Sequence, residues 1–407
     1  MRKIFTILLL LCSVSLSANT KTRKAVFIIA DGIPADQVER LTPPAIFDIA
    51  QKGSYARAQM GGEIGSYSQT PTVSAICYTS MLTSAWINKH DVNGNDNQNP
   101  NYNYPTIFRI AKDQQKDFKT AIYSSWTDNR TVLLGEGKQE TNHLKIDFAK
   151  DGYDLDTVHF GKKEKNLHIF EIDETVSLKA AEGIRKAAPD LSWVYLWYTD
   201  DAGHMAGNGA YFDEYVMKAD MQIQRIWEAV QYREANFDEE WMIVVFTDHG
   251  RTENGYSHGG QSDRERTIWF ATNQPVNDYA STNDLAITDI APSISKFMGF
   301  EIPHNTLWEQ DGKSFYGKAD IYNFKVRPYD NQAHLSWETF DKKAPVTIYI
   351  STTNNYKDGR SDEWIEIDTV EADKQNYQIN LDDYPESKFY KFVLATSNNH
   401  LNKWMIK

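Results

Sequence analysis

The chain contains very little cysteine. Among its 407 residues only Cys12 and Cys77 are cysteines. Residues 1–18 place Arg2 and Lys3 ahead of an apolar run that ends in small residues, a pattern that predicts a secretory signal peptide. Cleavage of that segment would leave Cys77 alone, which excludes an intrachain disulfide in the exported protein. We therefore expect a periplasmic or secreted protein that is stabilised by packing, with bound metal as a further source of stability.

Long apolar segments are also lacking. The N-terminal apolar run is too short to cross a bilayer and no other segment approaches the required length, so we expect no transmembrane segment. Basic side chains are outnumbered, because 43 Lys and Arg stand against 56 Asp and Glu, giving a formal net charge of -13. Nucleic acids are bound through basic patches, so this balance argues against a nucleic-acid polymer as a partner. The sequence gives no indication of the oligomeric state.

Between about residues 24 and 298, apolar runs alternate with amphipathic stretches. This alternation is typical of an α/β domain with a mostly parallel sheet flanked by helices. Helices are predicted over residues 34–49, 107–115, 174–188, 212–237 and 288–298. Strands are predicted to end at residues 31, 200 and 248, with further strands over 119–123 and 267–271. The length of this part is that of one large catalytic domain.

Near residue 322 the pattern changes to short, β-branched or aromatic runs separated by polar turns. Such runs predict a small all-β sandwich of the fibronectin type III kind. Its strands are expected over residues 334–337, 346–351, 364–370, 377–381 and 389–396. The predicted division is a signal peptide over 1–18, a catalytic domain over 19–322 and a sandwich over 323–407. The sandwich has no concentrated set of acids, bases or metal ligands, so we assign it to packing or to binding a surface.

Three apolar runs of the larger domain each end in an aspartate. FIIAD ends at Asp31, WVYLWYTD at Asp200 and MIVVFTD at Asp248. Because the carboxyl ends of parallel strands meet at one edge of a sheet, where open α/β sheets bind their ligands, we expect these carboxylates to lie together. A single aspartate in such a place is equally often a helix N-cap, so the functional interpretation depends on its neighbours.

Three histidines lie close in the sequence to these aspartates: His204, His249 and His258. Asp200 and His204 bracket Gly203, which we expect to let the chain turn tightly enough for both side chains to face one ion. His258 lies in SHGG, a glycine-containing loop able to return an imidazole to the sheet edge. Carboxylate and imidazole groups are ligands that divalent cations such as zinc prefer in proteins. The sequence therefore predicts a metal centre at this edge.

A candidate nucleophile lies in PTVSAICYTSMLTS, residues 71–84. Pro71 and Thr72 are helix-start signals, which would place Ser74 in the first turn of a helix. A helix N-terminus favours an incoming anion, and a neighbouring metal ion would lower the pKa of the hydroxyl. We therefore expect Ser74 to act as a nucleophile, with the hydroxyl of Thr72 as the alternative.

Five motifs in this order resemble the alkaline phosphatase superfamily: FIIADGIP, PTVSAICYTSMLTSAWINKHDV, YTDDAGHMAG, FTDHG and SHGG. Within the superfamily they are most similar to the type I phosphodiesterase and nucleotide pyrophosphatase branch, over roughly residues 24–317. The resemblance implies an alkaline-phosphatase-like fold and two Zn²⁺ ions, of which one site could accept another divalent cation. It also implies the ligands of each zinc. One zinc would be held by Asp31, Ser74, Asp248 and His249, and the other by Asp200, His204 and His258.

The chain departs from the pattern of that branch at two positions. Ser74 stands where a threonine nucleophile is common, and this exchange keeps the hydroxyl. Cys77 stands where the branch usually has an asparagine that holds a phosphate oxygen, so the resemblance makes Cys77 a substrate-binding position. A thiol donates more weakly than an amide, so the backbone amide of Ala75 or an asparagine from the 93–103 loop would have to assist.

The resemblance implies hydrolysis of phosphate esters, with a phosphodiesterase or nucleotide pyrophosphatase acting through a covalent phosphoryl-Ser74 as the first interpretation. The substrate would be a small-molecule or glycan-linked phosphate ester. A phosphomonoesterase or a phosphonate hydrolase could use the same site. A sulfatase is disfavoured, because Cys77 is followed four residues later by Met81 and not by arginine. An alternative of another class is a glycan-binding surface protein in which the metals are structural.

Overall fold

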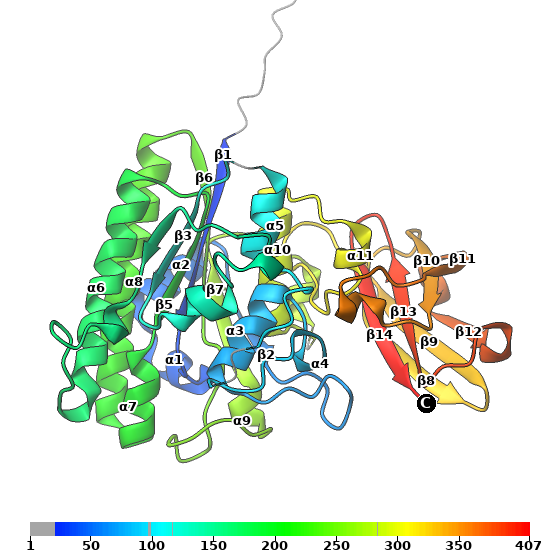
Figure 1. Ribbon diagram of the computed structural model, residues 1–407, viewed down its shortest axis with the longest axis horizontal. Helices are drawn as coiled ribbons and strands as arrows, with labels where there is room; N and C mark the ends of the chain where they lie inside the picture. Colours follow the sequence, from blue (N-terminus) through cyan, green and yellow to red (C-terminus); the bar gives the residue numbers. More distant parts are fainter. Residues whose placement is uncertain (1–20, 97–98, 116, 283) are drawn as a thin grey trace, which may run out of the picture.

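The computed structural model describes residues 21–96, 99–115, 117–282 and 284–407, so the predicted signal peptide and Cys12 lie outside the described residues. A larger α/β unit lies beside a smaller β unit, which ends the chain (Figure 1). The strands are β1 (Thr22–Ala30), β2 (Ser54–Gln59), β3 (Thr120–Ser124), β4 (Phe148–Lys150), β5 (Leu191–Leu196), β6 (Glu239–Phe246), β7 (Thr267–Thr272), β8 (Ile321–Tyr329), β9 (Gln332–Thr339), β10 (Pro345–Ser351), β11 (Ile365–Glu371), β12 (Asn376–Asn380), β13 (Phe389–Ala395) and β14 (His400–Ile406). The α-helices are α1 (Ala35–Leu41), α2 (Pro44–Lys52), α3 (Ser74–Thr83), α4 (Ile87–His90), α5 (Ile107–Gln114), α6 (Leu167–Lys186), α7 (Tyr198–Ala206), α8 (Ala210–Asn236), α9 (Asp263–Arg266), α10 (Ile290–Met298) and α11 (His304–Leu307).

The larger unit is built on a seven-stranded sheet in the order β2-β7-β6-β1-β5-β3-β4. The pairs β6-β1, β1-β5, β5-β3 and β3-β4 are parallel, whereas β7 is antiparallel to both β6 and β2. In the centre, Ile29 of β1 lies opposite Tyr195 of β5 and Phe246 of β6, so these three strands end at nearly the same level. The predicted mostly parallel sheet is confirmed.

Helices cover both faces of this sheet, with α6 and α8 on one side and α3, α5 and α10 on the other (Figure 1). Phe27 and Ile29 of β1 pack into the core beneath α3, and Val26 and Ile28 pack into the core beneath α8. A strand buried on both faces reads as a continuous apolar run, which is why the central strands were recognisable in the sequence.

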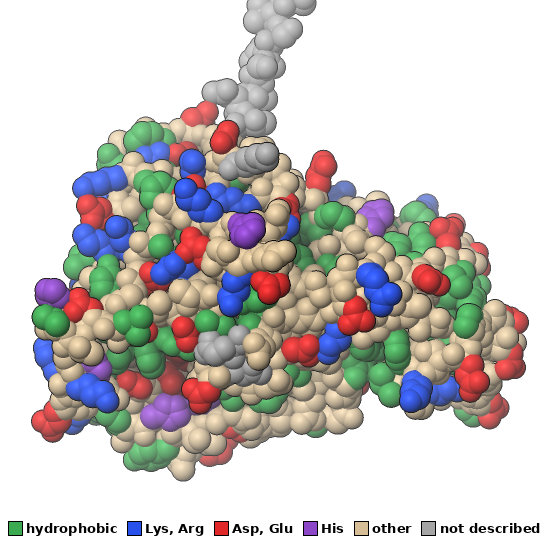
Figure 2. Space-filling model, viewed as in Figure 1, with side chains coloured by type: hydrophobic (Ala, Val, Ile, Leu, Met, Phe, Trp, Pro, Cys, Tyr) green, Lys and Arg blue, Asp and Glu red, His purple; other side chains and the backbone are tan. Residues whose placement is uncertain are grey.

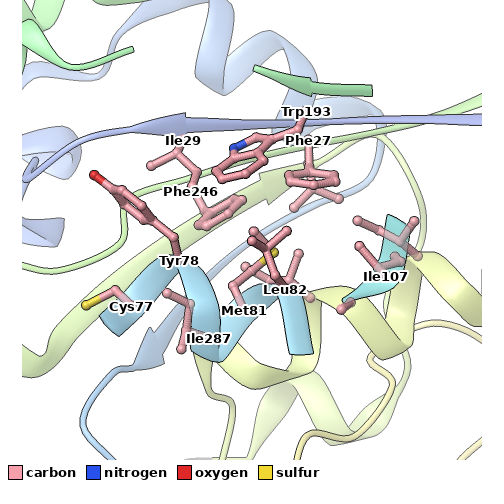
Figure 3. Close-up of a cluster of buried hydrophobic side chains, with 14 of the residues drawn as sticks. Phe27, Ile29, Cys77, Tyr78, Met81, Leu82, Ile107, Trp193, Phe246 and Ile287 are labelled. Atoms are coloured by element: carbon pink, nitrogen blue, oxygen red, sulfur yellow. The ribbon is translucent and has the colours of Figure 1, made fainter. Parts of the chain in front are cut away.

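Helix α3 is buried along its whole length and begins at Ser74. Figure 3 shows Tyr78, Met81 and Leu82 of this helix directed at aromatic side chains of the central strands, including Phe27 and Trp193. Such close packing leaves the helix little freedom to move. The first turn of α3 is therefore held firmly in place against the sheet.

The predicted helix over residues 34–49 is in fact two helices, α1 and α2. Thr42 adopts a positive φ of 47°, and Pro43 and Pro44 follow it. Proline lacks an amide hydrogen and disfavours helical conformation in the residue before it, so the first helix ends and the second begins with Pro44 at its first position.

The strand that leads to Asp200 is shorter than predicted, because β5 ends at Leu196 and α7 follows. The carboxylate of Asp173 accepts hydrogen bonds from the amides of Trp197 (3.0 Å) and Tyr198 (2.7 Å). These bonds satisfy two amides at the start of α7, which would otherwise lack partners. Asp200 therefore lies in the first turn of a helix and not at the end of a strand.

The C-terminal unit consists of two antiparallel sheets, in the orders β11-β10-β13-β14 and β12-β9-β8. Trp337, Ile348 and Phe392 from both sheets belong to one core, as expected of a sandwich. The strands β8 and β14 were not predicted, because polar or charged residues interrupt the apolar ones in each. The predicted division at residue 323 stays a prediction.

Two surface properties bear on the partners of the protein. On the face drawn in Figure 2, Lys and Arg side chains are interspersed with Asp and Glu and form no continuous basic area. Among the described residues, no helix combines the length and the hydropathy that crossing a bilayer requires.

Candidate active site

Side chains from five separate segments meet at the carboxyl edge of the large sheet. Asp31 follows β1, Ser74 opens α3, and a third segment, after β6, carries Asp248 and His249. Helix α7 carries Asp200 and His204 one turn apart, and His258 lies in the loop before α9. The structure thus brings together all seven side chains predicted to be metal ligands.

Asp31, Asp248 and His249 form a fully buried group beside Ser74. The Nε2 atom of His249 lies 3.2 Å from Oδ2 of Asp248 and 3.5 Å from Oδ1 of Asp31. The same nitrogen lies 3.3 Å from the hydroxyl oxygen of Ser74. A carboxylate pair, an imidazole and a hydroxyl therefore converge on one point.

Each carboxylate of this group has one oxygen held by the protein and one without a hydrogen-bond partner. Oδ2 of Asp31 accepts hydrogen bonds from the hydroxyls of Tyr195 (2.7 Å) and Tyr78, and Oδ1 of Asp248 accepts one from the amide of Gly32 (3.1 Å). Among the described residues, Oδ1 of Asp31 and Oδ2 of Asp248 are buried with no such partner. Burying an unpaired carboxylate oxygen is costly, so this geometry fits a bound cation.

Asp200, His204 and His258 form a second, more open group. Nε2 of His204 lies 3.2 Å from Oδ2 of Asp200 and 3.1 Å from Nε2 of His258. Nε2 of His258 in turn lies 3.6 Å from Oδ1 of Asp200. The ring of His258 stacks on His249 with centroids 3.7 Å apart, so the two groups adjoin. In the described part of the chain, possible donor atoms lie within 4.8 Å of one another in the groups Asp31–Asp248–His249 and Asp200–His249–His258.

All three histidines are oriented by backbone carbonyls. The distances from Nδ1 to the carbonyl oxygen are 2.8 Å for His204 to Tyr256, 2.7 Å for His258 to Thr72 and 2.9 Å for His249 to Gly250. A proton on Nδ1 satisfies each carbonyl and leaves the lone pair of Nε2 directed at the centre. This is the usual arrangement of histidines that bind metals.

The electrostatics of the Asp31–Asp248 pair show negative charge that no basic side chain among the described residues compensates. Burial, together with the charges of Asp248 and Asp200, raises the pKa of Asp31 well above its ordinary value. Burial is also the main cause that raises the pKa of Asp248 to about 7. For His249, burial lowers the pKa, so the imidazole is neutral. Close carboxylates and neutral imidazoles in a buried place are a suitable ligand set for a divalent cation.

Thr72, the alternative nucleophile, has its hydroxyl engaged elsewhere. It donates to the carbonyl of Gly260 and accepts from the amide of Gly259, both at 3.0 Å. Its own carbonyl holds His258. Thr72 thus holds the loop that carries His258, whereas the hydroxyl of Ser74 contacts Nε2 of His249.

Cys77 lies one turn after Ser74 and is fully buried. Burial raises the pKa of its thiol well above the ordinary value, so it keeps its proton. The amide of Ala75 and an asparagine of the 93–103 loop, the two donors expected to assist, contact each other: the amide donates to Oδ1 of Asn95 at 3.0 Å. A substrate contact of Cys77 stays a prediction.

Four residues that support the site were not predicted from the sequence. Tyr78 and Tyr195 hold Asp31, Asp173 holds the start of α7, and Arg251 pairs with Asp200. Arg251 directly follows FTDHG, so its position in the motif was a usable signal. The tyrosines and Asp173 act from distant parts of the chain, and nothing in their local sequence indicates their partners.

The family model described as type I phosphodiesterase / nucleotide pyrophosphatase matches residues 25–264, which include all seven predicted ligands. No curated protein matches the chain. Among solved structures, a putative sulfatase from Bacteroides thetaiotaomicron VPI-5482 is similar with a TM-score of 0.52 and 12% identity, over 85% of this chain and 85% of that chain. At this identity the likeness concerns the fold.

Two other solved structures are more distant. Murine ectonucleotide pyrophosphatase / phosphodiesterase 5 aligns with a TM-score of 0.48 and 10% identity, over 69% of this chain and 97% of that chain. Phosphonoacetate hydrolase from Sinorhizobium meliloti 1021, in complex with phosphonoformate, aligns with a TM-score of 0.41 and 17% identity, over 57% of each chain.

Proposed function

Because the chain belongs to the type I phosphodiesterase / nucleotide pyrophosphatase family, a metal-dependent family of phosphoester hydrolases, we propose that it cleaves phosphodiesters with Ser74 as the nucleophile. The family match covers more than half of the chain and contains the complete set of acids and histidines described above. We propose a small-molecule or glycan-linked ester as the substrate. We also propose that the protein acts in the periplasm or outside the cell, on the strength of residues 1–18.

One observation carries this proposal. The hydroxyl of Ser74 lies at the start of a rigid helix, 3.3 Å from Nε2 of His249. Beside it are the two buried carboxylate oxygens of Asp31 and Asp248 that have no hydrogen-bond partner in the described structure. A serine that served only as a helix cap would not need buried acids and an imidazole around its hydroxyl.

The residues fit two divalent cations, of which zinc is our first choice because imidazole and carboxylate ligands suit it. Asp31, Asp248 and His249 would hold one cation next to Ser74, and Asp200, His204 and His258 would hold the other. When bound, such cations supply Lewis-acid polarisation of phosphoryl oxygens and lower the pKa of bound hydroxyls.

The chain's own groups account for the covalent chemistry. Oγ of Ser74 forms a bond to phosphorus while the bond from phosphorus to the leaving-group oxygen breaks, which gives phosphoryl-Ser74 and an alcohol. The hydroxyl proton of Ser74 ends on the leaving oxygen. Water then attacks phosphorus, the bond to Oγ breaks, and a phosphate monoester and free Ser74 result. The N-terminus of α3 favours the anionic phosphoryl group at this position.

The test is turnover of an aryl phosphodiester by Ser74→Ala. We expect at least roughly a 10³-fold loss in kcat, the usual scale for removing a nucleophile. Ser74→Thr should keep substantial activity, because it retains the hydroxyl. Ser80→Ala is a matched control: Ser80 is also buried on α3, but its hydroxyl bonds to Ile76 and His90.

Unchanged turnover in Ser74→Ala would contradict the assignment of the nucleophile. A panel of an aryl monoester, a phosphonate and a sulfate ester, assayed at the same zinc concentration, decides between the diesterase and its relatives. If the wild type binds zinc and hydrolyses none of these esters, the alternative of a non-catalytic glycan-binding protein with structural metals is favoured.

A further inference from the structure

A buried arginine distinguishes the two groups of ligands. Arg251 is fully buried, and its Nη1 donates to Oδ1 of Asp200 at 2.5 Å. Its Nε donates to the carbonyl of Gly255 at 2.6 Å, which fixes the guanidinium in position. One carboxylate of the site thus already has a permanent positive partner.

The chain provides space for this guanidinium with two glycines. A Cβ atom at Gly203, on α7, would lie 2.5 Å from Cζ of Arg251. A Cβ atom at Gly32, where φ is +63°, would lie 2.8 Å from Nη1 of Arg251 and 2.7 Å from Oδ1 of Asp200. Any side chain at either position would displace the ion pair, so Arg251 is an integral part of this edge.

The first group has no such positive partner. Within the described ranges, the only ion pairs of Asp31 and Asp248 are those with His249. Its ligands therefore carry two formal negative charges, whereas the charge of Asp200 is balanced by Arg251. Solvent access differs too, because the side chain of His249 is 0% exposed and that of His204 is 40% exposed.

We propose that Arg251 makes the two cation sites unequal, so that the site of Asp31 and Asp248 fills first and the site of Asp200 and His204 fills second and exchanges more readily. This inference rests on the proposed function. Arg251 acts through Asp200 and is too deeply buried to touch a substrate, so it is a positioning residue that also sets the charge of its site. Groups that contact metal ligands in this way typically alter metal affinity by about 10- to 100-fold.

The first experiment is calorimetric titration of the metal-free wild-type protein with Zn²⁺. We expect two binding steps whose dissociation constants differ by at least about tenfold. Asp31→Asn should remove the tighter step and His204→Ala the weaker step. This order of loss identifies which site is which without any substitution of Arg251.

The second experiment tests the arginine itself. Arg251→Gln, which removes the charge and keeps a donor, should tighten the weaker step by about tenfold. Arg251→Lys, which keeps the charge, should leave that step within about threefold of the wild type. Arg264→Gln is a control for removing a nearby charge, because Arg264 pairs with Asp36 and donates to the backbone carbonyls of Thr252 and Arg251 but not to Asp200.

Two equal steps in the wild type would overturn this inference and leave the proposed function intact. Weaker binding at the second site in Arg251→Gln would also overturn it, because Arg251 would then act by geometry and not by charge. Absence of any zinc binding would overturn both the inference and the metal centre of the proposed function. If Arg251→Gln does not fold, the order of loss in Asp31→Asn and His204→Ala still tests which site fills first, and the opposite order would overturn the inference.

Discussion

The carboxyl edge of the sheet and the junction between the two units both bury several charged side chains, but they satisfy them differently. At the junction, Lys391 lies 2.8 Å from Glu309 and 2.7 Å from Asp362. Lys89 lies 2.7 Å from Asp311 and 4.0 Å from Glu309. Acids and bases at this place come from both units and compensate one another.

At the sheet edge, Asp31 and Asp248 face each other's charge, and each keeps a buried oxygen without a hydrogen-bond partner among the described residues. Burial is similar in the two places, so burial alone does not distinguish a structural charge cluster from a functional one. The distinction lies in whether the chain supplies its own counter-ions. Asp200, which Arg251 neutralises in part, stands between these two cases.

The largest effect is expected from Asp248→Asn, which removes one of the acids that lacks a counter-ion. Turnover of the diester should fall by at least roughly 10³-fold, equivalent to about 4 kcal/mol of lost transition-state stabilisation. The metal-free protein should not lose stability, because a like-charge repulsion is removed along with the carboxylate. Turnover and zinc content measure the first effect, and urea unfolding in a chelator measures the second.

Asp362→Asn is the counterpart at the junction, since it removes an acid that is paired with Lys391. The folded fraction should retain wild-type specific activity, and its unfolding midpoint in urea should fall. If Asp248→Asn kept full activity, or Asp362→Asn abolished it, the division between the two clusters would be wrong.

Lys391→Met should have the next largest effect, on stability. It leaves Glu309 and Asp362 buried without their closest cation, which typically costs about 3–5 kcal/mol. Urea unfolding measures the loss. Lys403→Met is the control at the same junction: Lys403 pairs with Glu63 at 2.9 Å, but both are exposed enough that about 1 kcal/mol or less is expected. Equal losses in the two variants would refute the difference in burial as the cause.

Removal of metal should affect only the sheet edge. A cation present at 100 times its dissociation constant stabilises the folded state by about 2.7 kcal/mol, so a chelator should lower the Tm of the wild type. Lys391→Met should show the same decrease from its lower starting point, because its ligands are intact. Asp248→Asn should respond much less. A chelator response in Asp248→Asn as large as that of the wild type would place the stabilising metal elsewhere.

The sequence predicted the edge cluster well, because each of its acids follows an apolar run or opens a motif. Asp31 and Asp248 follow strands that are recognisable from their apolar residues alone. The immediate support of these acids was not predictable. Tyr195 and Tyr78 reach Asp31 across the sheet, and Asp173 determines where α7 begins. Such contacts depend on the packing of distant segments, which local patterns do not encode.

The junction cluster was not predicted at all, for the same physical reason. Lys89, Glu309 and Lys391 are separated by long stretches of sequence, and although Lys391 lies within the apolar strand FYKFVLA, no local pattern indicates which acids it meets. A charged residue is usually exposed, so the burial of Lys89 and Glu309 is not expected from their own sequence. Only the docking of the sandwich against the larger unit brings them together.

The smallest effect concerns Asp173, a buried acid that has no basic partner among the described residues and lies outside the proposed metal centre. Its partners are the hydroxyl of Ser125 and the amides of Trp197 and Tyr198. Burial raises its pKa from 3.8 to about 7. The folded protein therefore binds this proton more tightly than the unfolded chain does. The stabilisation is complete at a pH below about 4 and is lost as the pH rises towards 7.

Between pH 6 and pH 7 this group should lower the free energy of unfolding by up to about 1.4 kcal/mol as the pH rises. Asp173→Asn cannot titrate at this position, so its free energy of unfolding should fall less over the same interval. The variant should be less stable than the wild type at pH 6, because the single carbonyl oxygen of an amide cannot accept all three hydrogen bonds. Urea unfolding of both proteins in a chelator at the two pH values measures the difference and cancels the other titrating groups. If the free energies of unfolding of the two proteins change in parallel with pH, Asp173 is ionised throughout this interval. Neutral hydrogen-bond donors alone would then satisfy a buried carboxylate as fully as the lysines of the junction do.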